Sequence, residues 1–500
     1  MFNNSLVKDF RTEILSGLTV ALALIPEAIA FSFIAKVEPL IGLYAAIIIG
    51  LITGIFGGRP GMISGATGAI AIVLGELFVN HPETRKYLFT IVILAGLFQI
   101  LFGVLKLGKL IRLVPEPVMY GFVNGLAILI FKAQFESFKG LDTRQIVVMS
   151  IIIICVMGII LFIPKITKAI PPALAAIVLS SLAVFIFKLD VPTVGEIASI
   201  KGGLPNLIIP QIPNSFSIWK LITKTALIMA AVGLIESLMT LTLIDEITKT
   251  RGRANKESIA QGLANVLTGL FGGMGGCAMI GQSMINIKSG GRKKVSSISA
   301  ALFLLFFVLF GSSVIELIPV SALVGVMFMV VIGTFEWETF NVIKKIPKSD
   351  SLVIFTVTIV TILTDLAVAV FVGIIISALV FAWESAKKIS AKRFIRKDGA
   401  AVYDLHGAIF FASTTQFKSI FLINSDPLEV YIDFKDARVH DHSGIEAINK
   451  LTKEYKNNGK KLHLLHLSSD CRQLLKDAGD LIEVNLSEDP NYKVSDNELA

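Results

Sequence analysis

Two glutamates, Glu27 and Glu236, each lie alone within a long apolar segment of the chain. A carboxylate at lipid depth is costly and usually faces a polar cavity, where it can take up a proton or bind a cation. Gly233, Glu236 and Thr240 recur at helical spacing and share one face of a predicted helix. This pattern predicts ion-coupling residues at Glu27, Glu236 and Thr240. The alternative is that each carboxylate only hydrogen-bonds broken backbone.

Two short apolar segments, at about 64–78 and 278–287, follow glycine-rich turns. Unusually short, glycine-interrupted segments in corresponding positions are typical of transport sites. Two helix N-termini that face each other near mid-membrane can bind an anion without a cation, because each end offers partial positive charge and free N–H donors. The candidate ligands at these ends are Ala66, Thr67, Met279, Ile280, Gly281 and Gln282. Alternatively, these small residues serve only close helix packing.

Three landmarks occur twice in the same order, which indicates two homologous halves. The segment Gly54–Gly61 matches the segment Gly269–Gly276 at five positions, with the shared pattern Phe-Gly-Gly-x-x-Gly. A lone glutamate precedes each copy, and a Leu-Val-Pro or Leu-Ile-Pro triplet follows it. Any single glycine match is weak, but the ordered set is typical of secondary transporters.

The composition is that of a protein that crosses a membrane many times. Of 500 residues, 54% are hydrophobic, and the mean hydropathy of +0.75 excludes a soluble globular protein. The net charge of +8 fits Lys and Arg in cytoplasmic loops, so no nucleic-acid partner is expected. The cysteines and histidines show no metal-binding spacing, and no GxSxG, Walker or HExxH motif is present. We therefore expect no enzyme, no metal and no cofactor.

The apolar runs predict about fourteen membrane segments, seven in each half. Besides the two short segments, they lie roughly at 14–35, 40–57, 88–105, 115–131, 146–163, 171–187, 220–244, 257–271, 295–315, 318–335, 351–364 and 366–384. Lys and Arg gather in alternate loops, which predicts a multi-pass protein of the inner (plasma) membrane with both termini cytoplasmic. The acidic residues beside one basic loop, Asp245, Glu246 and Glu257, are expected on a solvated surface.

The predicted domains follow from these runs and from a change of composition near residue 398. They are a cytoplasmic head at 1–13, a transmembrane domain at 14–386 with repeats at about 14–188 and 220–386, a soluble domain at 398–488 and a flexible tail at 489–500. The soluble domain is predicted as α/β, with strands at 402–405, 408–411, 428–434 and 461–467 and a helix around 445–455. The basic residues at 387–397 are predicted to form its connection.

These features resemble the SulP family of anion permeases over nearly the whole chain. The segments that carry the resemblance are Ile25–Phe31, Pro39–Tyr44, Ser64–Gly68, Arg251–Gly262 and Asn265. The C-terminal part resembles the family's STAS domain. The resemblance implies a helical seven-plus-seven inverted repeat split into core and gate domains, a homodimer in a lipid membrane, and an anion held between the third and tenth helices.

The chain differs from many relatives at positions that bear on coupling. Many members have Gln where this chain has Glu27, which is a candidate for both anion binding and coupling, and animal relatives often have Arg where it has Gln282. Sodium-dependent bicarbonate relatives pair an acidic residue with Thr, as Glu236 and Thr240 do, but use a hydroxyl where this chain has Ile280. The replacement of that hydroxyl by Ile280 favours proton coupling over sodium coupling.

In the STAS-like part, phosphorylatable relatives have Ser directly beside the Asp that corresponds to Asp441. Here His442 occupies that place and Ser443 follows it in Asp441-His442-Ser443-Gly444, so Ser443 is the regulatory candidate. A cytoplasmic protein partner of this domain is also expected. The expected function is proton-coupled secondary transport of sulfate, bicarbonate or a dicarboxylate by an elevator-like movement of the core. The alternatives are a sodium-coupled bicarbonate symporter and a non-transporting sensor that signals through the STAS domain. A nucleobase permease shares the core but lacks that domain.

Overall fold

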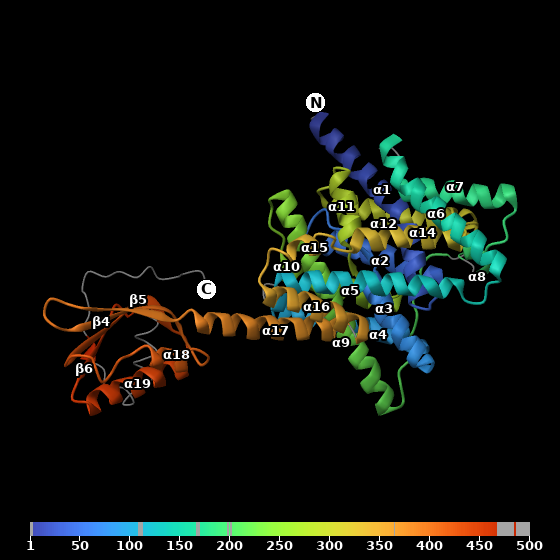
Figure 1. The fold of residues 1–500 in the computed structure, drawn as a ribbon. Helices are drawn as coiled ribbons and strands as arrows, with labels where there is room; N and C mark the ends of the chain where they lie inside the picture. Colours follow the sequence, from blue (N-terminus) through green and yellow to red (C-terminus); the bar gives the residue numbers. More distant parts are fainter. Residues whose placement is uncertain are drawn as a thin grey trace. The chain divides into compact units, whose positions relative to one another are not determined.

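Helices form most of the chain up to Lys387 in the computed structural model, and a small α/β unit follows (Figure 1). The structure describes residues 4–108, 114–166, 171–197, 200, 203–364, 366–467 and 485–486. Contacts divide the chain into two units, Met1–Ile374 and Ile375–Ala500. The predicted tail at 489–500 lies outside the described residues.

Each predicted apolar run overlaps one of the longer helices, although the run at 295–315 also covers most of a short second helix, and the runs at 64–78 and 278–287 begin in strands. In the first half these are α1 (Asn4–Ile34), α2 (Pro39–Phe56), α3 (Gly68–Asn80), α4 (Leu88–Val104), α5 (Glu116–Gln134), α6 (Thr143–Ile166) and α7 (Pro172–Phe187). In the second half they are α9 (Phe216–Thr248), α10 (Ala254–Leu270), α11 (Ile280–Lys288), α12 (Lys294–Phe310), α14 (Val320–Thr334), α16 (Lys348–Leu363) and α17 (Leu366–Lys387). Shorter helical pieces are η1 (Pro82–Tyr87), η3 (Phe135–Phe138), α8 (Val194–Ile197), α13 (Ser312–Glu316) and α15 (Thr339–Val342). Among the described residues, 8 helical segments are long and apolar enough to cross a membrane, so the number of spans stays a prediction.

The first helix extends into the segment at 1–13 that sequence analysis treated as a separate head. Helix α1 begins at Asn4, and its Glu13 is only 3% exposed. The Glu13 carboxylate accepts hydrogen bonds of 2.7 to 3.2 Å from three backbone N–H groups between Arg292 and Ser296. Glu13 therefore caps the start of α12 and joins the two halves of the chain.

Two three-residue strands pair inside the helical unit. Strands β1 (Ser64–Ala66) and β2 (Gly276–Ala278) are antiparallel, with Gly65 opposite Cys277. Sequence analysis predicted only helix starts here, because three residues are too few to show strand alternation. A Cβ atom on Gly276 would lie 2.0 Å from the carbonyl oxygen of Gly65, so this approach requires glycine.

The membrane helices pack in two groups, each drawn from both halves of the chain. The core group consists of α1 to α4 and α9 to α12, and the gate group of α5, α6, α7, α14 and α16. Figure 1 shows α5 and α16 of the gate group running side by side. Fewer contacts join the groups, mainly from α1 and α3 to α5 and α14.

Glycines hold α4 and α10 in backbone contact within the core group. A Cβ on Gly262 would lie 2.5 Å from the Gly96 carbonyl oxygen, and a Cβ on Gly96 would lie 2.6 Å from the Gly262 carbonyl oxygen. Small residues at such positions allow close helix approach in membranes, where no hydrophobic force drives helices together.

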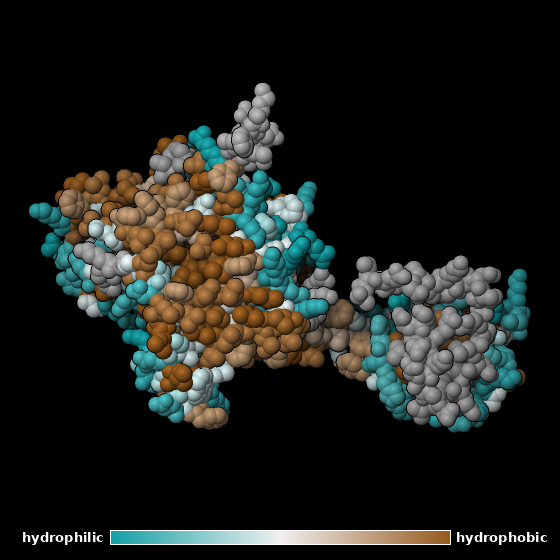
Figure 2. Space-filling model, turned by 180° about the vertical axis from the view of Figure 1, so that it is seen from behind, coloured by the Kyte–Doolittle hydropathy of each residue, from teal (hydrophilic) through white to brown (hydrophobic). Residues whose placement is uncertain are grey.

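The outside of the helical unit is apolar. Figure 2 shows a broad hydrophobic face over it, with hydrophilic residues at its margins. Large side chains such as Ile154, Phe185, Phe310 and Phe371 are at least 65% exposed. A soluble protein does not expose apolar area on this scale, whereas a bilayer accommodates it.

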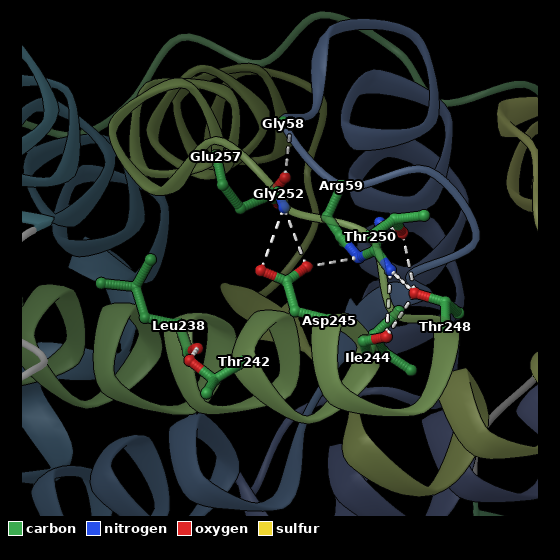
Figure 3. A network of polar contacts seen from close by, with 10 residues as sticks. All are labelled: Gly58, Arg59, Leu238, Thr242, Ile244, Asp245, Thr248, Thr250, Gly252 and Glu257. Atoms are coloured by element: carbon green, nitrogen blue, oxygen red, sulfur yellow. Dashed lines mark hydrogen bonds and ion pairs between the residues drawn. The ribbon is translucent and has the colours of Figure 1, made fainter.

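A buried arginine fastens the turn after α2 to the end of α9 (Figure 3). Arg59 forms an ion pair with Asp245 at 3.0 Å. It donates hydrogen bonds to the Thr250 hydroxyl at 2.9 Å, the Ile244 carbonyl at 3.0 Å and the Thr248 hydroxyl. The first glycine-rich landmark is thereby fixed to the second half of the chain.

The surface prediction for the neighbouring acidic residues was wrong for Glu257. Its side chain is 1% exposed and accepts a hydrogen bond from the Gly58 N–H at 2.7 Å (Figure 3). It also accepts a hydrogen bond from the Gln261 amide at 2.9 Å. Glu246 is exposed as expected, and Asp245 is partly covered by Arg59. A charged loop in the sequence does not reveal which carboxylate turns inward to satisfy backbone donors.

The C-terminal unit contains a five-stranded sheet in the order β3-β4-β5-β6-β7, with β3 antiparallel and the others parallel. Its elements are β3 (Ser390–Ile395), β4 (Ala401–Ile409), α18 (Thr414–Ser419), β5 (Glu429–Val439), α19 (His442–Asn457), β6 (Lys461–Leu465) and β7 (Asn485–Leu486). The two predicted strands at 402–405 and 408–411 are one strand, β4, with an irregularity between Asp404 and His406.

The first strand of this unit was also missed. Sequence analysis treated 387–397 as a connection, but β3 occupies residues 390–395. Its Lys and Arg residues hide the apolar alternation that identifies a strand, which is typical of an edge. One of them, Arg393, forms an ion pair of 2.9 Å with buried Asp426, which also accepts hydrogen bonds from the Tyr403 and Tyr455 hydroxyls.

The contact between α4 and α10 predicts that Gly262→Val lowers the thermal unfolding midpoint. The added side chain meets backbone atoms at 2.5 and 2.6 Å, and such overpacking costs about 1–3 kcal/mol or more. Gly158→Val on α6 is the matched control, since a Cβ there meets nothing within 4 Å. A thermal shift measurement in detergent should separate the two variants. Equal midpoints would contradict the backbone contact.

Candidate functional site

A cavity of about 540 Å³ lies between the core group and the gate group. This central cavity is lined on the core side by Glu27, Phe31, Thr67, Gly68, Glu236, Met279, Ile280, Gly281, Gln282 and Lys288, and on the gate side by Tyr120, Phe122, Val330, Thr334 and Glu336, with further apolar residues. Helices from both halves of the chain contribute to it.

The cavity brings together most of the predicted site residues and leaves out two. Seven of them line it: Glu27, Thr67, Glu236, Met279, Ile280, Gly281 and Gln282. Ala66 lies in β1, is 1% exposed and is not among the lining residues. Thr240 is fully buried, and its hydroxyl donates to the backbone carbonyl of Glu236 at 2.8 Å instead of facing the cavity.

Two helices begin at the wall of the central cavity. Helix α3 starts at Gly68 with Thr67 as its N-cap, and α11 starts at Ile280 with Met279 as its N-cap. Neither N-cap side chain bonds its own helix. The first backbone N–H groups of a helix have no acceptor within it, so both ends can donate to an anion. Gly281 is exposed to open space, which lets a ligand approach the backbone of α11.

A glutamate of the first half meets a glutamine of the second half at this wall. The side chain of Glu27 on α1 hydrogen-bonds the side chain of Gln282 on α11. The Gln282 amide oxygen is buried and has no hydrogen-bond partner in the described part of the chain. That oxygen can therefore accept a hydrogen bond from a ligand or from a protonated carboxyl group.

The second glutamate is connected to the other helix start by a thiol. Cys277 in β2 donates its thiol hydrogen to Glu236 Oε2 at 2.9 Å, and its sulfur lies 3.2 Å from Thr67 Oγ1. Cys277 is fully buried. Sequence analysis counted it only as an isolated cysteine. Its position directly after the second glycine-rich landmark and directly before the short apolar segment at 278–287 was the signal that could have identified it.

Charged residues in the cavity wall are mostly acidic. Three carboxylates line it, from Glu27, Glu236 and Glu336, against one ammonium group, from Lys288. Sequence analysis did not select Glu336 or Lys288, because charges near helix ends are common. With all four groups ionised, this wall carries a formal charge of −2, the sum of −3 and +1.

Ser443 lies apart from the cavity, in the α/β unit. It is in the first turn of α19, where the Asp441 side chain accepts hydrogen bonds from the backbone of Gly444 at 2.9 Å and Phe411 at 2.8 Å. A phosphate on a side chain in a first helical turn is stabilised by the helix dipole. The regulatory role of Ser443 stays a prediction.

The two halves with matching landmarks, the cavity between two helix groups and the appended α/β unit define a membrane permease with a STAS-type domain. Residues 10–154 and 144–358 match the sulfate permease family, and residues 392–490 match the STAS domain. The chain belongs to the sulfate permease family, which confirms the predicted resemblance.

Curated relatives and solved structures agree with this membership. A putative sulfate transporter of Bacillus subtilis, YbaR, is 43% identical over 94% of this chain and 97% of its own length. The bicarbonate transporter BicA of Picosynechococcus is 32% identical over 74% of this chain and 70% of its own. The transmembrane domain of a cyanobacterial BicA superposes with a TM-score of 0.65 at 30% identity, covering 74% of this chain and 98% of that one. Murine Slc26a9 in the inward-facing state shares the fold, with a TM-score of 0.80 at 18% identity over 94% and 87% of the two chains.

The geometry predicts that Gly281→Val and Thr67→Val weaken anion binding without unfolding the protein. A Cβ at residue 281 meets nothing within 4 Å, so the valine side chain fills cavity space instead of pushing on the protein. It would hold an anion away from the α11 backbone. Thr67→Val removes a hydroxyl donor at nearly constant volume. We expect at least a tenfold loss of affinity for each, since a hydrogen bond to a charged group contributes about 1.5–3 kcal/mol.

Equilibrium binding of radiolabelled sulfate and bicarbonate, beside a thermal unfolding curve, measures this effect. Gly158→Val serves as control, because it adds the same side chain in open space on α6, away from the cavity. Wild-type affinity in both Gly281→Val and Thr67→Val would remove the anion from this position.

Proposed function

We propose that this protein is a secondary active transporter of a small anion, namely sulfate, bicarbonate or a dicarboxylate, across the plasma membrane. The observation that supports this most directly is that two helix N-termini and two carboxylates line one cavity. Helix N-termini attract anions of many shapes, so the charge and size of an anion determine whether it belongs to the substrate class. The names of the relatives YbaR and BicA, a putative sulfate transporter and a bicarbonate transporter, favour the inorganic anions.

The charge of the cavity wall supports coupling to protons. With Glu27, Glu236 and Glu336 ionised and Lys288 as the one ammonium group among the lining residues, the net negative charge of the wall repels an entering anion. Protonation of Glu27 or Glu236 removes one negative charge each and lets the helix ends dominate. Anion and proton then bind together, which is the thermodynamic requirement for symport.

A sodium-coupled bicarbonate symporter is the second candidate. The name of the BicA relatives motivates bicarbonate as the substrate, and the Glu236 and Thr240 pair motivates sodium as the coupling ion. A cation site next to Glu236 needs several oxygen ligands in its neighbourhood. Here the corresponding position in α11 is Ile280, and the Thr240 hydroxyl is already directed to the Glu236 carbonyl oxygen. These two features favour the proton over sodium.

Movement of the core group against the gate group is the proposed transport step. The cavity lies between the groups, whereas glycine contacts such as Gly96 to Gly262 lock helices within the core group. We further propose a homodimer with both termini in the cytoplasm, where the STAS domain meets a protein partner and Ser443 is available for modification. A non-transporting sensor would share this fold but would need no anion-accessible helix ends.

The hypothesis of proton coupling predicts a specific behaviour for Glu236→Gln. The amide mimics the protonated carboxyl at similar volume, so the variant should still bind the anion and exchange anion for anion. It should lose its response to an imposed pH gradient, because no proton can be gained or lost at this position. Uptake of radiolabelled anions into proteoliposomes measures both properties, and Glu27→Gln shows whether the second carboxylate shares the role.

A sodium gradient at constant pH provides the contrasting condition. Sodium-driven uptake in the wild type that disappears in Glu236→Gln, together with no response to pH, would contradict proton coupling. A wild type that catalyses no anion flux under any gradient would instead favour the sensor.

Removal of the STAS domain should leave transport partly intact. The cavity-lining residues all precede α17, so they remain in a chain that ends at Lys388. This end point keeps α17 and removes β3 together with the strands it pairs with, whereas a cut near Arg396 would leave β3 as an unpaired edge. We expect measurable uptake with altered rate or abundance. Complete loss of transport in a well-folded truncated protein would make the STAS domain part of the mechanism.

A further inference from the structure

The Cys277 thiol stands between two groups that both line the central cavity. Its Sγ atom lies 2.9 Å from Glu236 Oε2 and 3.2 Å from Thr67 Oγ1. Glu236 belongs to α9, Thr67 precedes α3, and Cys277 lies in β2 opposite Gly65. The thiol is fully buried, so water does not compete for either contact.

A thiol has one hydrogen and can donate only one hydrogen bond at a time, while its sulfur accepts weakly. With Glu236 ionised, the carboxylate accepts the thiol hydrogen, as in the structure. The sulfur is then the acceptor for the Thr67 hydroxyl, whose hydrogen is directed to Cys277. In this arrangement Thr67 offers an anion only its lone pairs.

Protonation of Glu236 reverses the direction of both hydrogen bonds. The new carboxyl hydrogen is donated to the Cys277 sulfur, and the thiol hydrogen turns to the Thr67 oxygen. The Thr67 hydroxyl hydrogen is released from the sulfur and can be donated into the cavity, at the N-terminus of α3. The only covalent bond that forms is the O–H bond of the incoming proton on Glu236, and two hydrogens rotate, those of the Cys277 thiol and the Thr67 hydroxyl.

We propose that Cys277 is a positioning residue that transmits the protonation state of Glu236 to the anion site through Thr67. This inference rests on the proposed proton-coupled function and adds a route for the coupling besides direct charge repulsion. By reciprocity, an anion that accepts the Thr67 hydrogen favours the protonated form of Glu236.

Other ionisable groups share the cavity with Glu236 and must be separated from this route. They are Glu27 on α1, Tyr120 on α5, Lys288 on α11 and Glu336 before α15. Among the described residues, Cys277 is the titratable side chain in hydrogen-bond contact with Glu236. A substitution of Cys277 changes the thiol route and leaves all of these charges in place.

The first test is spectroscopic and needs no known substrate. In a protein with Cys155→Ser and Cys471→Ser, the remaining S–H stretching vibration belongs to Cys277. Its infrared band should shift when the pH is lowered, because the thiol then donates its hydrogen to the neutral Thr67 oxygen instead of the charged Glu236 carboxylate. Glu236→Gln should fix the band at one frequency at every pH. A band that does not move in the Glu236-containing protein while its anion binding responds to pH would overturn the proposal.

The second test compares sulfate dissociation constants above and below the midpoint of the wild-type pH response. The ratio of the two constants should fall about tenfold in Cys277→Ala and about tenfold in Thr67→Val. The double variant should show no further fall, because both substitutions remove the same route. Cys277→Ser, which keeps one donor and an acceptor, should retain the ratio. Cys155→Ala, an exposed cysteine on α6, is the control.

The outcomes separate this route from the function on which it rests. A purely structural Cys277 would change affinity equally at both pH values, and an unchanged ratio in Cys277→Ala with a pH-dependent wild type would overturn the thiol route alone. A wild type whose sulfate affinity and S–H band are both independent of pH would overturn proton coupling at Glu236 itself, and the thiol route with it.

Discussion

The need to pair backbone groups inside a bilayer governs the centre of this molecule. Two segments interrupt their helices at membrane depth, and each must find hydrogen-bond partners within the protein. They find one another as β1 and β2, and the Asn265 side chain bonds both the N–H and the carbonyl of Gly276 at 2.9 Å. Because the strands are antiparallel and each leads into a helix, the starts of α3 and α11 are brought to the same cavity with donors to spare.

The sequence was informative where one residue type has few physical solutions in a membrane. A lone carboxylate in an apolar helix must face a polar space, and Glu27 and Glu236 do so. Small residues at the start of a short apolar segment predicted a helix start that a ligand can approach, and a Cβ on Gly281, in the first turn of α11, would meet nothing within 4 Å. The helices themselves followed from apolar length, and the resemblance to a known family supplied the grouping into core and gate.

The sequence was uninformative where a partner lies far along the chain. Strands β1 and β2 are too short to show a period, and their pairing joins residues about two hundred positions apart. Cys277 has no signature because its role depends on Glu236 and Thr67 being nearby in space. In the sequence, Glu257 lies beside a charged loop, which suggested an exposed side chain. In the structure it is buried, because its carboxylate accepts a hydrogen bond from the backbone N–H of Gly58.

Glycine has two opposite uses in this protein, and the difference explains how a rigid group of helices can border an open site. At Gly96, Gly262 and Gly276 the missing side chain lets backbone touch backbone, so any Cβ would collide at 2.6 Å or less. At Gly281 the missing side chain leaves space that no other residue fills. The first kind binds the core helices into a unit that resists internal change. The second kind lies on the surface of that unit facing the gate group. The close packing inside the core group therefore supports the proposal that the transport movement occurs between the core group and the gate group.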